Sequence, residues 1–101
     1  MTQEEVKEAV NYLQTNTPLK EKYKGNDNYG IPKQEYLTKL VQLADDQLSK
    51  ECEQFIWLSA YANNNPRSDY HWKCDVCYDE CQRRNHLEIY SNAYKSVTGS
   101  L

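Results

Sequence analysis

The stretch HWKCDVCYDEC, residues His71 to Cys81, decides how the C-terminal third of the chain folds. It holds three of the four cysteines and contains neither Gly nor Pro. On a helix Cys74, Cys77 and Cys81 stand at positions i, i+3 and i+7, which lie on one face. They then span about 10.5 Å along the axis, whereas thiolates that share one zinc ion each lie ~2.3 Å from it. We therefore expect residues 69 to 82 to form one uninterrupted helix, with the cysteines packed as small apolar side chains.

Two other uses of the cysteines remain open at this point. A structural zinc site could combine Cys74 and Cys77 with Cys52 and either His71 or His86 from neighbouring turns or helices. A dithiol redox centre would need a thiolate of lowered pKa, and the carboxylates around the cysteines oppose that ionisation. The zinc-stabilised helical module is the first alternative to a metal-free fold, and the redox protein is the second.

The N-terminal part of the chain predicts a helix and then a short turn. Thr2 and Glu5 fit a capping box, and apolar residues recur at helical spacing after them, which predicts a first helix over residues 3 to 14. Residues 19 to 24 follow a Thr-Pro start signal and form a short helical turn that ends at Gly25.

The middle of the chain predicts further helices. Pro32 begins a helical pattern that continues to about residue 62, as one long helix or as two that join near Asp45, and we favour two because Asp45 can cap the second. The run Asn63 to Pro66 ends this pattern.

The last helix begins at Ser68 or Asp69 and reaches Val97, either unbroken or interrupted near Asn85. Because no segment shows the sustained alternation of a strand, the sequence predicts an all-α fold. We expect one domain over residues 1 to 101, a bundle of four to five helices with a long C-terminal helix.

One weak internal similarity appears at a shift of 31 residues. The pair Gln3-Glu4 matches Gln34-Glu35, and Val10 matches Val41. Two amphipathic helices would match this well by chance, so the similarity alone does not establish a repeat.

Charge and hydropathy exclude several classes of protein. The formal net charge is -3 and no basic stripe exists, which argues against direct binding of nucleic acid. The chain opens with MTQEEVKEAV, which has acidic residues where a signal peptide needs a basic segment, and no apolar run is long enough for a membrane helix. We expect no membrane association and a cytoplasmic location, in the producing cell or in a host cell.

The sequence shows no catalytic signature. Only three glycines occur, no phosphate-binding motif is present, and the adjacent carboxylates point in different directions on a helix. The chain is therefore predicted not to be an enzyme and to need no cofactor.

Tyrosine-rich composition indicates protein binding instead. Nine Tyr and two Trp against one Phe place many rings at the edge of a thin core, as at protein interfaces. We expect a small inhibitor or adaptor that occludes a basic surface of a partner protein, with self-association as a further possibility. Compact acidic proteins of this kind include antidefence inhibitors of phages and other mobile elements. The predicted contact residues surround the cysteines: Tyr70, Trp72, Asp75, Tyr78, Asp79 and Glu80.

Overall fold

The chain forms five α-helices and one short 3-10 helix over residues 1–61 and 68–99, the part that the computed structural model describes. Along the chain the elements are α1 (Gln3–Thr15), η1 (Lys20–Tyr23), α2 (Lys33–Leu40), α3 (Asp45–Tyr61), α4 (Tyr70–Arg83) and α5 (Leu87–Thr98). Within those residues the sole β-type pairing is an isolated bridge between Asn26 and Pro32. The predicted all-α bundle is confirmed.

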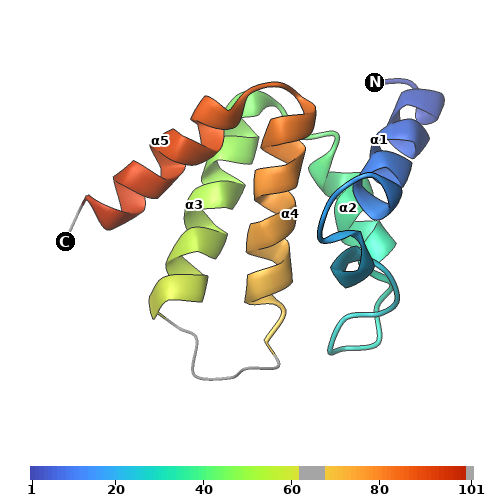
Figure 1. Cartoon of the computed structure of the whole chain (residues 1–101), viewed down its shortest axis with the longest axis horizontal. Coiled ribbons are helices and arrows are strands. Elements are labelled where there is room, and N and C mark those ends of the chain that lie inside the picture. The colour runs from blue at the N-terminus through green and yellow to red at the C-terminus, as the bar shows by residue number, and fades with distance from the viewer. Residues whose placement is uncertain (62–67, 100–101) are drawn as a thin grey trace.

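Helix α4 lies at the centre of the bundle and packs against α1, η1, α2, α3 and α5. Figure 1 shows α3 and α4 side by side, with α1 and α2 on one side of α4 and α5 running back across α3 on the other. A fully buried core joins these layers, and its largest apolar members are Leu13, Tyr23, Leu37, Leu40, Leu48 and Val76. A helix with neighbours on so many sides buries more than one face, so some of its polar side chains are buried as well.

The start of α1 follows the predicted capping box. The Thr2 hydroxyl accepts the Glu5 backbone N–H at 3.2 Å, and the Glu5 carboxylate accepts the Thr2 backbone N–H at 3.3 Å. Two backbone donors that the helix itself leaves unpaired are thereby satisfied. The helix ends at Thr15, one residue later than predicted.

The region 32–62 divides into two helices, as favoured from the sequence. Helix α2 ends at Leu40 and α3 begins at Asp45. The side chain of Gln47 accepts the backbone N–H of Ala44 at 3.1 Å, so a glutamine inside the first turn stabilises this start. The run predicted to end α3, residues 63–66, lies outside the described residues.

The C-terminal helical segment breaks at Asn85, one of the two outcomes that the sequence left open. Asn85 adopts a left-handed backbone with φ of 61°, which asparagine tolerates better than most residues. The backbone N–H of Asn85 bonds to Gln82 O and that of His86 bonds to Cys81 O, both at 2.9 Å. This pair of bonds is a Schellman motif, which ends α4 and redirects the chain into α5.

No helix among residues 1–61 and 68–99 is both long enough and apolar enough to span a bilayer.

Candidate functional site

The cysteines of α4 lie along an unbroken helix, as predicted. Cys74 Sγ lies 3.4 Å from Tyr90 Oη on α5, and Cys77 Sγ lies 3.9 Å from Tyr36 Oη on α2. Cys81 Sγ lies 3.8 Å from Cys52 Sγ on α3, and Cys77 also contacts Cys52. All four cysteines are free thiols, and all but the half-buried Cys74 are buried. The sulfurs thus serve as small packing groups where α4 meets three other helices.

The zinc alternative finds no ligand set in this arrangement. Among the described residues, no group of three or more His, Cys, Asp or Glu side chains is placed to hold one metal ion. Cys77 is buried and His71 is exposed, so the proposed ligands do not gather around a point. A tetrahedral zinc site would need all four groups within ~2.3 Å of one position.

The environment of the thiols also opposes nucleophilic or redox chemistry. Burial raises the pKa of the Cys74 thiol. A hydrogen bond with Cys77, together with burial, raises the pKa of Cys52, and a hydrogen bond with Cys52, again with burial, raises that of Cys81. A thiol reacts as its thiolate, so these groups are poor nucleophiles at neutral pH.

Three of the six predicted contact residues are buried, which corrects that part of the prediction. The Trp72 side chain is 7% exposed and donates its indole N–H to Asp69 at 2.8 Å. Asp79 is buried and accepts a hydrogen bond from the Tyr23 hydroxyl. Glu80 is fully buried. These three side chains hold the bundle together and cannot meet a partner in this fold.

Glu80 carries its buried charge inside a cluster of arginines. Its carboxylate accepts two hydrogen bonds from the Arg83 guanidinium, both at 2.7 Å, and one from the Arg84 guanidinium at 2.8 Å. Arg84 also donates to the backbone carbonyl of Leu40 at 3.3 Å and to the Asp45 carboxylate at 3.0 Å. The cluster links the end of α4 to the end of α2 and the start of α3, and the charge of Glu80 is compensated as a buried charge requires.

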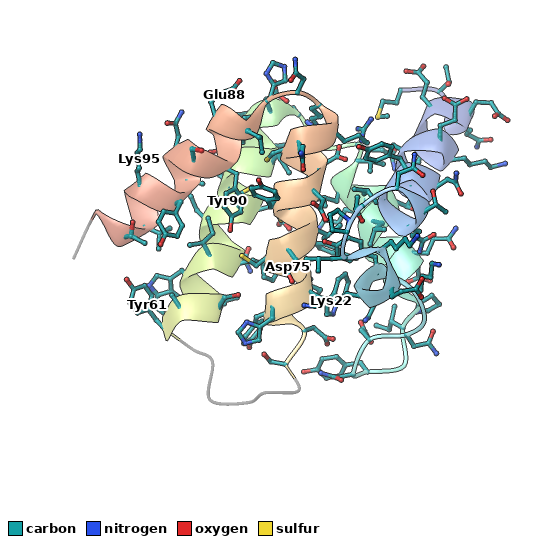
Figure 2. The ribbon with its side chains drawn as sticks, in the orientation of Figure 1. Lys22, Tyr61, Asp75, Glu88, Tyr90 and Lys95 are labelled. Carbon is teal, nitrogen blue, oxygen red and sulfur yellow. The ribbon has the colours of Figure 1, made fainter. Side chains whose placement is uncertain are left out.

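The other three predicted contact residues remain accessible to different degrees. Tyr70 is half-buried. The Asp75 carboxylate lies 3.5 Å from Lys22 Nζ, and Figure 2 shows these two side chains turned toward each other. Tyr78 is exposed, and its ring meets the Tyr90 ring edge to face, with centroids 5.2 Å apart. The α4 face that can meet a partner is therefore narrower than the sequence indicated.

Four of the exposed aromatic side chains lie on the three helices of the C-terminal half. We call this set the aromatic surface: Trp57 and Tyr61 on α3, Tyr78 on α4 and Tyr94 on α5. Trp57 and Tyr94 are 51% and 52% exposed, and the Trp57 and Tyr61 rings lie 5.8 Å apart. The three helices pack against one another, and α3 and α5 lie on the opposite side of α4 from α1 and α2 (Figures 1 and 2).

Sequence reasoning missed three members of the aromatic surface. A signal for Trp57 was present, because it directly follows Ile56 on the buried stripe and so points about 100° away from it. Tyr61 stands four residues after Trp57 and shares its outward face. Tyr94 gave no such signal, since Leu87, Tyr90, Tyr94 and Val97 recur at helical spacing and predict an apolar face.

Comparison with known proteins assigns no family to the chain. No family model matches it, no curated protein matches it, and no solved structure matches it. Its function is therefore inferred from its own residues and contacts.

Proposed function

We propose that the chain is a small non-catalytic module that binds another protein through the aromatic surface and acts as an inhibitor or adaptor. The observation that carries this proposal is the exposure of Trp57 together with Tyr61, Tyr78 and Tyr94 on three packed helices. Tryptophan and tyrosine dominate the energetically important positions of protein interfaces. Exposed aromatic side chains are also typical of surfaces that bind other proteins.

Burying the aromatic surface would offset most of the cost of association. Each of the four rings exposes about half of its area, roughly 100 Å², and burying that area contributes about 2.5 kcal/mol at 25 cal/mol per Å². Four rings then provide about 10 kcal/mol of gross free energy, which is comparable to the entropic cost of association. Contacts around the rings supply the remaining affinity.

Charge favours a basic partner. The net charge is -3, and carboxylates accompany the rings along their helices: Glu53 precedes Trp57 by four residues, and Asp75 precedes Tyr78 by three. Such carboxylates steer encounter and fix the register of docking more than they add affinity. The proposed site of action is the cytoplasm of the producing or host cell, and an antidefence inhibitor of a phage or mobile element is one role that this character suits.

A pull-down from lysate with matched variants tests the proposal. Wild type should retain a specific protein, and Trp57→Ala and Tyr94→Ala should each weaken its capture by about 2 kcal/mol, roughly 30-fold. The control is Tyr29→Ala, because Tyr29 is 85% exposed on a loop outside the aromatic surface, and its removal should leave capture unchanged. Equal capture by all four proteins, with melting curves that show intact folds, would reject the aromatic surface as the interface.

The mode of action needs a second measurement on the captured partner. An inhibitor should reduce the partner's own activity in proportion to occupancy, whereas an adaptor should leave that activity intact and recruit a third protein. Raising the salt concentration should slow association if carboxylates steer a basic surface. If the alanine variants instead change only the oligomeric state of the chain, the aromatic surface joins two copies and the proposed heterologous partner is excluded.

A further inference from the structure

A second surface lies between α1 and α2, away from the aromatic surface. The two helices border a groove of about 560 Å³, a volume in the usual range of ligand sites. Val6 and Val10 contribute apolar side chains to its lining. Each helix also contributes a row of polar side chains spaced four residues apart: Gln3, Lys7 and Asn11 from α1, and Gln34, Thr38 and Gln42 from α2 and the turn after it.

The two rows occupy equivalent positions in the sequence. The similarity at a shift of 31 residues aligns Gln3 with Gln34, and it places Asn11 opposite Gln42 in the same alignment. Whether or not the helices share an ancestor, the groove has two similar walls in which a polar side chain recurs about once per turn and the first and last of each row are amides.

Much of the hydrogen-bonding capacity of these walls is unused. Gln3, Asn11 and Gln34 make no side-chain hydrogen bond within the described residues, and their amides each offer donors and an acceptor. Gln42 uses its amide N–H on the backbone at 2.8 Å and keeps its oxygen free. Among the described residues that line the groove, Lys7 alone has a charged side chain, and it forms no ion pair.

The spacing of the walls matches an extended peptide. Side chains four residues apart on a helix recur every ~6 Å, and alternate residues of a strand recur every ~6.7 Å, so each rung can meet one outward-facing peptide group. An extended chain carries unpaired N–H and C=O groups along both edges, which the two rows of polar side chains complement. A helical partner offers no unpaired backbone N–H and C=O groups, because they bond to one another within the helix. The polar walls also do not match the apolar face of an amphipathic helix.

We propose that the groove between α1 and α2 binds an extended peptide segment of a partner protein, about four or five residues long, with an acidic residue beside Lys7. Amide groups of both walls recognise the peptide backbone, small apolar side chains rest on Val6 and Val10, and the Lys7 ammonium pairs with the carboxylate. This site is independent of the aromatic surface and of the function proposed for it.

Peptide arrays with defined probes test this inference. The probes are pentapeptide mixtures with Asp fixed at the centre, the same mixtures with Lys at the centre, and Asp-centred mixtures whose alternate backbone nitrogens are methylated. Wild type should bind the Asp-centred set about tenfold more tightly than the Lys-centred set, and methylation should abolish binding because it removes the N–H donors.

Variants of the full chain locate the binding. Lys7→Gln should remove the preference for Asp, and Gln34→Ala should weaken binding of the best peptide severalfold. The matched control is Lys95→Gln, which changes an exposed lysine on α5, and α5 lies on the opposite side of α4 from α1 and α2 in Figure 2. This variant should bind the peptide as wild type does.

Three results would overturn the inference: equal binding of Asp-centred and Lys-centred sets, tolerance of backbone methylation, or unchanged binding by both Lys7→Gln and Gln34→Ala. All the substituted residues are exposed, so melting temperatures should stay at the wild-type value. Because the readout is a synthetic peptide, its failure leaves capture through the aromatic surface untouched, and the reverse also holds.

Discussion

Replacing Glu80 with glutamine tests whether the buried ion cluster fastens α4 to the rest of the bundle. Glutamine has nearly the same size and shape, so the packing of the fully buried side chain is preserved. The substitution removes the negative charge and leaves Arg83 and Arg84 without the carboxylate that accepts three of their hydrogen bonds. We expect Glu80→Gln to lower the free energy of unfolding.

The magnitude follows from how exposed the two arginines remain. Removing one partner of a buried ion pair typically costs about 3 to 5 kcal/mol. The side chains of Arg83 and Arg84 are 23% and 13% exposed, and Arg84 keeps its bond to Asp45, so water and other partners offset part of the loss. We therefore expect about 2 to 3 kcal/mol, a large fraction of the stability of a domain of this size.

Urea denaturation at neutral pH, followed by far-UV circular dichroism, measures the effect. The midpoint should fall while the slope m stays constant, because the native and unfolded surfaces are unchanged. Glu88→Gln is the matched control, since the Glu88 side chain is 62% exposed and its carboxylate pairs with His86 at the surface. It should change stability by less than about 0.5 kcal/mol. If Glu80→Gln unfolds as wild type does, the cluster is not an anchor and the reasoning fails.

Three further predictions concern the thiols, Asp79 and Asn85. Under native conditions at neutral pH the buried cysteines should be alkylated no faster than the chain unfolds, and Cys74 should react slowly; rapid labelling of all four thiols would contradict the packing described for α4. Burial raises the pKa of Asp79, so the folded state favours the protonated carboxyl group. Its contribution to the free energy of unfolding is therefore complete below the ordinary pKa of 3.8 and is lost as the pH rises through the raised pKa. Asp79→Asn keeps an acceptor for the Tyr23 hydroxyl, and its stability relative to wild type should therefore increase as the pH of urea denaturation is raised from acidic to neutral; a decrease would show that the charged form is favoured. Asn85→Val should lower stability by about 1 to 2 kcal/mol because of the positive φ, while Asn85→Gly should be close to neutral in the same thermal melts; equal melting of both variants would argue against the left-handed turn.

The order and type of the helices were predictable because local signals specify them. The Thr2–Glu5 capping box sets the start of α1, and the absence of Gly and Pro between Ser68 and Gly99 allows a long helical segment. Asn85 was recognised only as one possible break. Asparagine permits the left-handed turn without requiring it, so the packing of α5 on α3 has to decide between the two outcomes.

The burial of Trp72, Asp79 and Glu80 was not predictable from periodicity alone. Helical patterns assume one buried face, whereas α4 has neighbours on several sides and buries most of its circumference. A partial signal did exist, because Glu80 has Arg83 and Arg84 three and four residues later, which are positions that allow a compensated buried charge. For Asp79 the partner is Tyr23, 56 residues away, and no local pattern reveals it.

The groove between α1 and α2 shows a similar limit of sequence reasoning. The similarity between the two helices was visible, but only the fold shows that both polar rows line one groove. The pattern on each helix predicts which of its faces is apolar, but it does not predict which face of one helix lies beside which face of the other.

Site-specific photo-crosslinking in the producing or host cell tests the central claim, that the chain works by binding a protein through its aromatic surface. A photoreactive phenylalanine analogue placed at Tyr94 should crosslink to one defined protein, and the same analogue at Tyr29, which is even more exposed, should not. Crosslinking from both positions alike, or from neither, would contradict the account.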